Sequence, residues 1–245
     1  MATGIVNNDF SDVVFNRYAE RSLDPNVKIS YEELLEIIAQ ATRAPSALDS
    51  QPWHFLIAHT DEGKAKLDSW MWSVDRGRII SSSASVVVFA DLDWFEHFEE
   101  IVEQNRLAPN GYSDEAAAMT LKLAAGWMPE LIAEGGLESS VIFQAGLVAM
   151  QLMLVARAHG YETGPMDAFT REGFAADFGL DGDRFLPVFF IAIGKPAATL
   201  AAPVEDAAAV AGHGGVDFGE TRSLSPMYLH IHTTRRAPEQ VSTFV

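Results

Sequence analysis

The chain has 245 residues, of which 48% are hydrophobic and 21% are charged, and it contains no cysteine. This composition is typical of a globular protein of one or two domains, and it excludes disulfides, thiolate metal ligands and a cysteine nucleophile. The 17 basic and 34 acidic residues leave a formal net charge of -17, which repels nucleic acid phosphates and anionic lipids. We therefore expect no nucleic acid partner and no membrane partner.

The N-terminus and the longest uncharged stretch argue against targeting and membrane-spanning segments. Residues 1–10 have neither the basic region nor the apolar region of a signal peptide, which predicts a cytoplasmic protein. The uncharged stretch 139–156 is shorter than the roughly 20 apolar residues that a membrane span needs. We expect it to form a helix that is buried in the core or in an interface.

Helix starts and apolar runs predict alternating helices and strands in the first half of the chain. Ser30 and Glu33 form a capping box that precedes apolar residues at helical spacing. The run 85–90 is β-branched and bounded by polar residues, which is typical of a buried strand. The predicted elements are a helix over 31–43, a strand over 54–59, a helix over 60–72, a strand over 85–90 and a helix over 93–106.

The second half of the chain is predicted to be mainly helical up to its last buried strand. Residues 197–223 are rich in alanine and glycine and predict a surface connector. The predicted elements are helices over 114–133, 141–158 and 170–178, and strands over 186–194 and 228–232. This order indicates an α+β or α/β domain with about four or five strands and more helices than strands.

Common nucleotide-binding and catalytic motifs are absent from the sequence. No Gly-x-Gly-x-x-Gly follows a predicted strand, no phosphate-binding loop precedes Gly194, and no Gly-x-Ser-x-Gly elbow occurs. His230 and His232 have ligand-like spacing, but no third ligand is near them in the sequence. We expect no metal site.

The segment between the first predicted helix and the first predicted strand carries the most informative pattern. Its residues Ala44-Pro-Ser-Ala-Leu-Asp-Ser-Gln-Pro-Trp53 resemble the Ala/Ser-Pro-Ser-x-x-Asn-x-Gln-Pro-Trp hallmark of the FMN-dependent nitroreductase family. Further matching segments follow in the family's order; these are Arg17-x-Ala19-x-Arg21, 86–89, 164–169, 188–194 and Arg236-Ala-Pro238. The resemblance therefore covers nearly the whole chain and is loosest over 93–137 and 197–223.

The resemblance implies an α+β, nitroreductase-like fold and an intertwined homodimer. Helices would flank a central, mostly antiparallel sheet, and residues 1–245 would form a single domain. Within that domain, residues 93–137 would be a variable helical lid insertion. Residues 224–245 would be a C-terminal arm exchanged with the partner subunit.

The resemblance also implies an FMN site. Arg17 would meet the ribityl phosphate, Arg21 would meet the pyrimidine edge of the ring, and a backbone N–H of the turn 165–168 would bond flavin N5. A guanidinium at the pyrimidine edge suits the negative charge that reduction places at N1 and O2. The implied FMN-binding residues are Arg17, Tyr18, Ala19, Arg21, Pro45, Ser46, Ala47, Asp49, Pro165, Met166, Asp167, Ala168, Arg235 and Arg236.

Several of these positions depart from the family pattern. Asp49 stands where the family usually has asparagine, so it either points away from the flavin or lowers the flavin potential. Ala168 replaces a glycine, which requires ordinary backbone angles in the turn. Near the C-terminus the family presents a Lys-x-Arg pair to the phosphate. Arg236 keeps the arginine of this pair, and Arg235 would replace the missing lysine.

The predicted lid carries aromatic residues that resemble the family's cover over the substrate. The implied substrate contacts are Trp94, Phe95, Phe98 and Tyr112. For each of these side chains, packing inside the lid is the alternative.

The predicted function is that of an FMN-dependent NAD(P)H oxidoreductase that reduces nitroaromatic, quinone or similar electron-poor acceptors. Hydride would pass through flavin N5 by ping-pong exchange, and no side chain would be needed as catalytic acid or base. One alternative within the fold is a specialised flavoenzyme, such as a reductive dehalogenase or an oxidase of a peptide ring. The others are a non-catalytic, flavin-binding redox sensor and an acidic interaction module without flavin.

Overall fold

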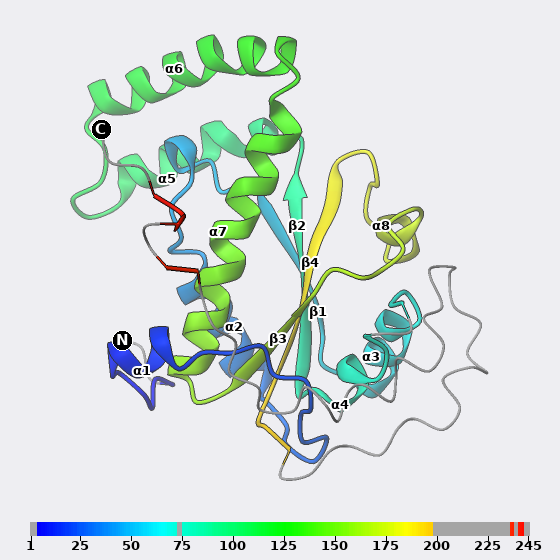
Figure 1. The fold of residues 1–245 in the computed structure, drawn as a ribbon. Helices are drawn as coiled ribbons and strands as arrows, with labels where there is room; N and C mark the ends of the chain where they lie inside the picture. The colour runs from blue at the N-terminus through cyan, green and yellow to red at the C-terminus, as the bar shows by residue number, and fades with distance from the viewer. Residues whose placement is uncertain (1–3, 73–74, 198–235, 238–239, 243–245) are drawn as a thin grey trace.

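A four-stranded antiparallel sheet in the order β1-β2-β4-β3 runs through the centre of the protein (Figure 1). The computed structural model describes residues 4–72, 75–197, 236–237 and 240–242. The strands are β1 (Trp53–Ala58), β2 (Ala84–Asp91), β3 (Glu162–Met166) and β4 (Phe185–Gly194). The predicted α+β class with a mostly antiparallel sheet is confirmed.

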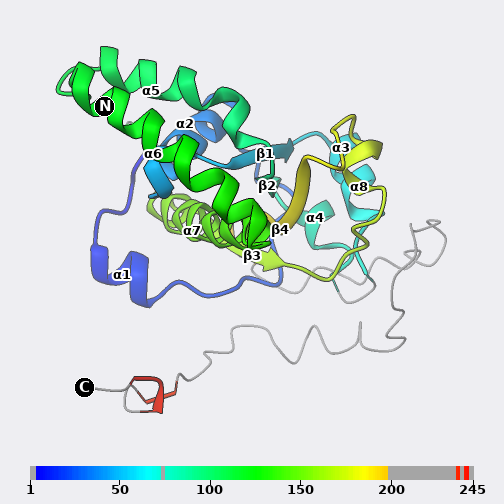
Figure 2. The ribbon, with the colours of Figure 1, turned by 90° about the horizontal axis from the view of Figure 1, so that it is seen from above.

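Helices outnumber strands among the described residues, as predicted. The α-helices are α1 (Phe10–Phe15), α2 (Tyr31–Ala41), α3 (Asp61–Asp68), α4 (Arg78–Ser81), α5 (Phe98–Leu107), α6 (Asp114–Ala133), α7 (Leu137–Ala158) and α8 (Phe174–Asp177). Two short 3-10 helices are η1 (Ala47–Asp49) and η2 (Trp94–His97). Figure 2 shows α3, α4 and α8 gathered at one side of the sheet and the long helices α5, α6 and α7 at the other.

The two faces of the sheet support two separate hydrophobic cores. Because side chains alternate along a strand, Val86 and Val88 of β2 face α2 and α7, whereas Val87 and Phe89 face α3 and α8. Every residue of β2 is buried, as the β-branched sequence predicts. Covered on both faces and paired on both edges, β2 is the centre of the fold.

Helix α7 is the central helix that the sequence predicts. By length and composition, α7 alone among the helices of the described residues would be able to cross a membrane. Instead it packs on α2 and on the sheet and buries eight of its residues. Gly160 then adopts a left-handed φ of 81° just beyond its end, where only glycine avoids a steric cost.

The structure corrects several element boundaries. The helix that follows Thr60 ends at Asp68 instead of Trp72, and the helix predicted over 170–178 is limited to α8. Strand β3 contains Gly164 and Pro165, which are poor strand residues, so local propensity did not reveal it. Its pairing with β4 over five residues holds it in the sheet.

The capping box forms only in part. The Ser30 hydroxyl accepts a hydrogen bond from the Glu33 backbone N–H, as predicted. The Glu33 carboxylate instead accepts from the hydroxyl of Tyr161, which lies three residues beyond the end of α7. The predicted strand over 228–232 and all of the connector except Ala197 lie outside the described residues.

Candidate functional site

The N-terminal motif lies along the outer edge of β3. Ala19 forms a parallel bridge with Thr163, and the Glu20 N–H donates to the Thr163 carbonyl at 2.9 Å. A side chain at Gly164 would place its Cβ 2.5 Å from the Glu20 carbonyl oxygen. Glycine is therefore required here for the close approach of the two segments.

The buried carboxylate of Glu20 organises this motif. It accepts the backbone N–H groups of Arg21 and Ser22 at 2.8 and 2.9 Å, and it accepts the Tyr18 hydroxyl at 3.0 Å. Burial, reinforced by the Glu20 charge, raises the pKa of Tyr18 to about 12. Tyr18 is therefore a neutral donor at pH 7, and its hydroxyl is directed to Glu20.

The segment that follows α3 is brought beside the end of β3. The Trp72 N–H donates to the Ala168 carbonyl at 2.8 Å, and Met71 forms a bridge with Phe169. These contacts join residues about a hundred positions apart in the sequence. They bring the loop before α4 to the predicted flavin turn.

This junction contains the arginine cluster, which we define as Arg21, Asp75, Arg78 and Asp167. Arg78 and Asp75 form an ion pair of 2.9 Å, with side chains that are only 13% and 10% exposed. Burial raises the pKa of Asp75, against the opposing influence of Arg78 and Arg21. Burial also lowers the pKa of Arg78, and the positive charge of Arg21 contributes to this shift. The cost of removing these charges from water thus exceeds their mutual stabilisation.

The turn predicted over 165–168 is in part a strand end. Pro165 and Met166 are the last residues of β3, and only Asp167 and Ala168 lie beyond it. Asp167 is exposed and Met166 is buried. Among the described residues, Ala168 is not one of those with positive φ, so the expectation of ordinary backbone angles is confirmed.

The hallmark loop 45–51 is held in a strained conformation. Leu48, Asp49 and Gln51 have left-handed φ values of 54°, 57° and 47°. The Ala47 N–H donates to the buried Gln144 side chain of α7 at 2.8 Å, and the Gln51 N–H donates to the Ser46 hydroxyl at 3.0 Å. The surroundings therefore fix backbone angles that these residues would not adopt alone.

Asp49 is directed to the predicted lid. Its carboxylate accepts a hydrogen bond of 2.7 Å from the Asn105 side chain of α5. Of the predicted substrate contacts, Phe98 is fully buried and Trp94 is 4% exposed. Phe98 leaves no surface for a substrate, whereas Phe95 is 40% exposed and Tyr112 is half-buried.

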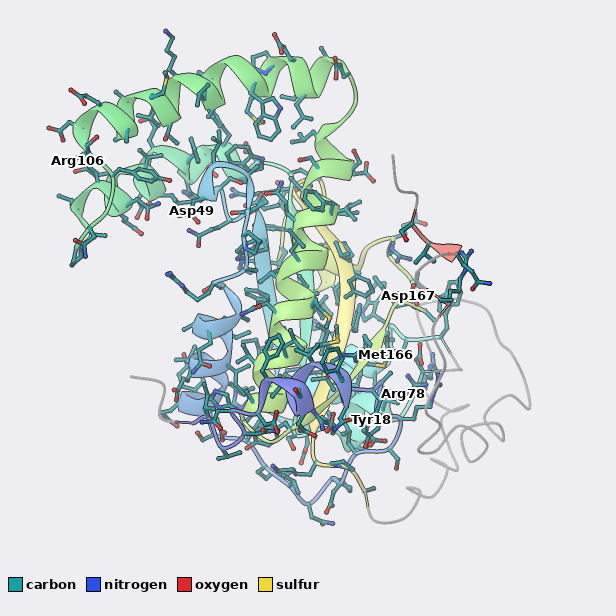
Figure 3. All side chains as sticks on the ribbon, turned by 60° about the vertical axis from the view of Figure 1, so that its left-hand side comes forward. Tyr18, Asp49, Arg78, Arg106, Met166 and Asp167 are labelled. Carbon is teal, nitrogen blue, oxygen red and sulfur yellow. The ribbon has the colours of Figure 1, made fainter. Side chains whose placement is uncertain are left out.

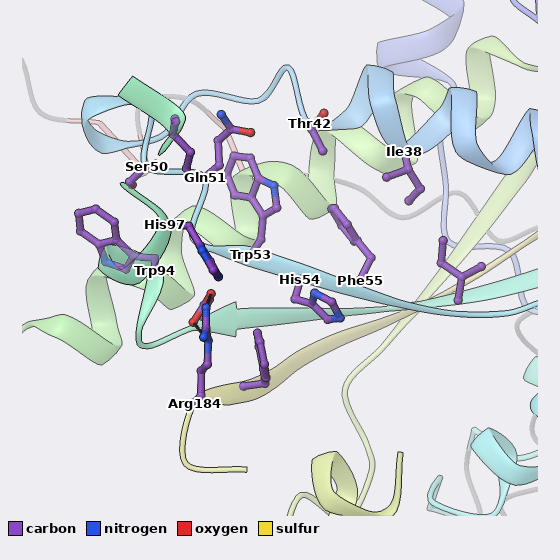
Figure 4. Close-up of a pocket in the computed structure, with 14 residues that line it drawn as sticks. Ile38, Thr42, Ser50, Gln51, Trp53, His54, Phe55, Trp94, His97 and Arg184 are labelled. Atoms are coloured by element: carbon purple, nitrogen blue, oxygen red, sulfur yellow. Dashed lines mark hydrogen bonds and ion pairs between the residues drawn. The ribbon is translucent and has the colours of Figure 1, made fainter. Parts of the chain in front are cut away.

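An open hollow of about 640 Å³ lies beside β1, between α2 and η2 (Figure 4). Trp53, Phe55 and Ile57 of β1 line it together with Arg184, which pairs with Asp91. Burial lowers the pKa of His54, another lining residue, which keeps this imidazole neutral at pH 7. Ser50, also in the lining, has a buried hydroxyl with no hydrogen-bond partner among the described residues.

The predicted flavin residues thus form two groups in one chain. Figure 3 shows Tyr18, Arg78, Met166 and Asp167 gathered on one side of the molecule, while Asp49 lies apart from them beside the helix that carries Arg106. Arg236 is exposed and donates to the Gln240 carbonyl within its own turn. Arg235 lies outside the described residues.

Comparison with known proteins gives this arrangement its context. The sequence model of the nitroreductase family matches residues 14–77 and 128–195, which include both groups apart from Arg78. The chain belongs to the nitroreductase family. The residues between the two matched parts, 78–127, include Arg78 and most of the predicted lid.

Three relatives illustrate the match to this family. A protein of Bacillus subtilis named as an NAD(P)H nitroreductase is 40% identical over 197 residues, covering 79% of this chain and 91% of that protein. The CLA biosynthesis enone reductase of Lactiplantibacillus plantarum is 37% identical over 198 residues, covering 79% and 88%. A nitroreductase structure from Exiguobacterium sibiricum in complex with FMN has a TM-score of 0.71 and 35% identity, covering 82% of this chain and 96% of that chain.

The arginine cluster has a donor set that suits the cofactor of such a family member. Guanidinium groups present several N–H donors in a fixed plane, which matches phosphate and carbonyl oxygens. In the cluster, Arg21 comes from the N-terminal motif, and Arg78 is the first residue of α4. No group of three or more His, Asp or Glu side chains within the described part of the chain would hold a metal ion.

Sequence reasoning missed three residues of this junction, namely Glu20, Asp75 and Arg78. Glu20 lies inside the recognised Arg17-x-Ala19-x-Arg21 motif, at a position that the motif leaves open. Asp75 and Arg78, just before and at the start of α4, have a local sequence that resembles an ordinary charged surface turn. Their i,i+3 spacing was the one available signal, since it favours an ion pair at the start of a helix.

Proposed function

We propose that this nitroreductase-family protein binds FMN and transfers hydride from NAD(P)H to an electron-poor acceptor, in the cytoplasm, as a homodimer. The observation that carries the proposal is the arginine cluster beside the end of β3, in a chain 35% identical to a structure in complex with FMN. When bound, the flavin supplies the hydride chemistry, and the protein supplies binding and orientation. Nitroaromatics and quinones are the proposed acceptors.

The side chains of one group have separate tasks in this proposal. Arg17 would hold the phosphate, and Arg21 would stabilise negative charge at the pyrimidine edge. Arg78 would add a second guanidinium that Asp75 fixes in place through the 2.9 Å ion pair. Pro165, Met166, Asp167 and Ala168 would form the surface beneath the ring, with ordinary backbone angles at Ala168.

A second copy of the chain would complete the site. Because one chain keeps loop 45–51 apart from the arginine cluster, a twofold dimer would place the loop of one protomer against the cluster of the other. Phe143, Leu147 and Met150 of α7 follow at helical spacing and are 59%, 36% and 38% exposed, which suits such an interface.

The exchanged arm, residues 224–245, would cover the hollow beside β1 in the same dimer. The outer edge of β1 pairs with no other strand among the described residues. An alternating sequence such as 227–231 would satisfy its backbone groups and cover Trp53 and Phe55. Arg235 and Arg236 would then reach the partner's FMN phosphate.

A second candidate function is reduction of an α,β-unsaturated carbonyl compound. This candidate is favoured by the 37% identity to an enone reductase over most of both chains. It requires the same cofactor and the same arginine cluster. It differs only in the acceptor that the lid residues, Phe95 and Tyr112 among them, would admit.

The visible spectrum of the purified protein, followed by anaerobic titration with NADH and NADPH, tests the proposal. Yellow protein that is bleached by either reductant and recoloured by nitrofurazone or menadione is the expected result. Faster recolouring by an unsaturated ketone would favour the second candidate. Protein that remains colourless after incubation with FMN would overturn both, and flavin that is reduced only slowly would indicate a redox sensor.

A further inference from the structure

Asp49 forms a direct link between loop 45–51 and the lid helix α5. The Asn105 Nδ2 donates to Asp49 Oδ2 at 2.7 Å across 56 positions of sequence, and both residues are half-buried. A carboxylate that accepts from an amide makes one of the stronger hydrogen bonds in proteins. The contact therefore fixes the relative position of two segments that the sequence places far apart.

Asn105 also organises the end of the lid. Its carbonyl accepts the Tyr112 N–H at 3.0 Å, which folds the turn at 108–111 back onto α5. A Cβ at Gly111 would lie 1.8 Å from that carbonyl oxygen, so glycine is required for the turn. One residue thus holds Asp49 with its side chain and Tyr112 with its backbone.

The Asp49 bond lies in the last turn of α5, beyond the residues that anchor the helix in the core. Phe98 and Val102 anchor the first half of the helix in the core, at 0% and 2% exposure. Its last residue, Leu107, is 68% exposed. Figure 3 shows Asp49 on the same side of the molecule as Arg106, which also belongs to the last turn of α5.

Asp49 itself has a left-handed φ of 57°, in a loop with two further left-handed non-glycine residues. Such residues persist only where their surroundings determine them, and asparagine and aspartate tolerate this region best. The hydrogen bond from Asn105, which lies outside the loop, helps to hold Asp49 in this backbone conformation. A displacement of α5 would therefore weaken the loop, and a disordered loop would free α5.

We propose that Asp49 is a positioning residue that couples the cofactor loop to the substrate lid. This inference rests on the proposed function, in which loop 45–51 lines the FMN of the dimer. Energetic coupling between two sites is reciprocal, so FMN strengthens the attachment of α5, and attached α5 strengthens FMN binding. The aspartate that departs from the family's asparagine serves the lid instead of the flavin.

FMN titration of the full-length dimer, followed by quenching of flavin fluorescence, tests the coupling. Asn105→Ala should raise the Kd for FMN about tenfold, which corresponds to about 1.4 kcal/mol. The same change in an Asp49→Ala background should have no further effect. Asp49→Asn keeps a weaker, neutral acceptor for Asn105 and the tolerance for left-handed φ, so its Kd should rise less than that of Asp49→Ala.

Gln104→Ala is the matched control, because Gln104 is a neighbouring amide on α5 whose side chain donates to Glu100 of the same helix. Hydrogen exchange gives the reciprocal measurement, since FMN should protect the last turn of α5 in wild type but not in Asn105→Ala. An unchanged Kd in Asn105→Ala, or an equal loss in Gln104→Ala, would overturn the coupling alone. Wild-type protein that binds no FMN would overturn the proposed function and the coupling with it.

Discussion

The arginine cluster and loop 45–51 belong to the same proposed site, but different forces hold them. In the cluster, Asp75 and Arg78 carry opposite charges into a place where both side chains are nearly inaccessible to water. In the loop, the cost lies in three left-handed residues, each of order 1–3 kcal/mol. Hydrogen bonds that the loop donates to Gln144 and accepts from Asn105 offset this cost. We therefore expect the arginine cluster to be sensitive to substitutions that change charge. Loop 45–51 should be sensitive to substitutions that change the shape of the backbone or of the side chains that hold it.

Removal of the C-terminal arm should have the largest effect on dimerisation and FMN binding. It tests whether the arginine cluster or loop 45–51 functions without the second chain. A protein truncated after Ser223 loses residues 224–245 and should be monomeric and free of FMN. Obligate interfaces commonly bury more than about 2,000 Å², so a partial loss is not expected. Light scattering and flavin absorbance give the two readings. A truncated dimer that keeps its flavin would show that both regions are complete without the arm.

Arg78→Ala should cause the next largest effect, on folding itself. It leaves the Asp75 carboxylate buried without its partner, which costs about 3–5 kcal/mol in the free energy of unfolding. Urea denaturation measures this loss. The control is Arg106→Ala, whose partners Glu103 and Asp114 are exposed, and a loss below about 1 kcal/mol is expected there. Equal losses in the two variants would remove the distinction between buried and exposed pairs.

Arg21→Ala tests the cluster through the flavin instead of through stability. Loss of one charge-assisted contact is worth about 1.5–3 kcal/mol, so the flavin reduction potential should fall while much of the FMN affinity remains. Spectroelectrochemistry of the holoprotein measures the potential. Arg43→Ala, at an exposed position near the hallmark loop, is the control. A potential that does not change would remove Arg21 from the pyrimidine edge.

Gln144→Ala tests loop 45–51 through the same two quantities, the flavin reduction potential and the affinity for FMN. It leaves the Ala47 N–H without its acceptor, at a cost of about 1–3 kcal/mol in stability. Because no charge is lost, the flavin potential should stay the same while FMN affinity falls. Gln151→Ala, on the same helix and half-buried, should have little effect on either. A changed potential in Gln144→Ala would contradict the division between charge in the cluster and shape in the loop.

The smallest expected effect is a pH dependence of the folding stability, which should arise from the arginine cluster alone. Since burial raises the pKa of Asp75 above its ordinary value of 3.8, the folded state retains a proton that the unfolded state releases. This contribution is complete below the unfolded pKa and is lost as the pH rises through the folded pKa. The stability of wild type relative to Asp75→Asn should therefore fall as the pH rises above about 4 in urea titrations. A difference that rises over this range would reverse the assigned direction.

The sequence by itself determined the features that depend on neighbouring residues. Strand β2 extends the predicted run 85–90 by one residue at each end, because a β-branched run that is apolar throughout has few alternatives to a buried strand. The end of α7 at His159 and Gly160 follows from the need for a left-handed residue there. The hallmark pattern over 44–53 was enough to indicate the family.

Only the tertiary structure decided which charges are buried and which segments meet. Asp75 and Arg78 have an ordinary local sequence, and they are removed from water only because β3 pairs with β4 and brings Ala168 to Trp72. Likewise, Asp49 has a partner because α5 passes beside the loop, 56 positions further along the chain. Helix caps and strand runs are set by interactions over a few residues, whereas desolvation depends on the whole arrangement of elements, and a local sequence pattern does not contain that information.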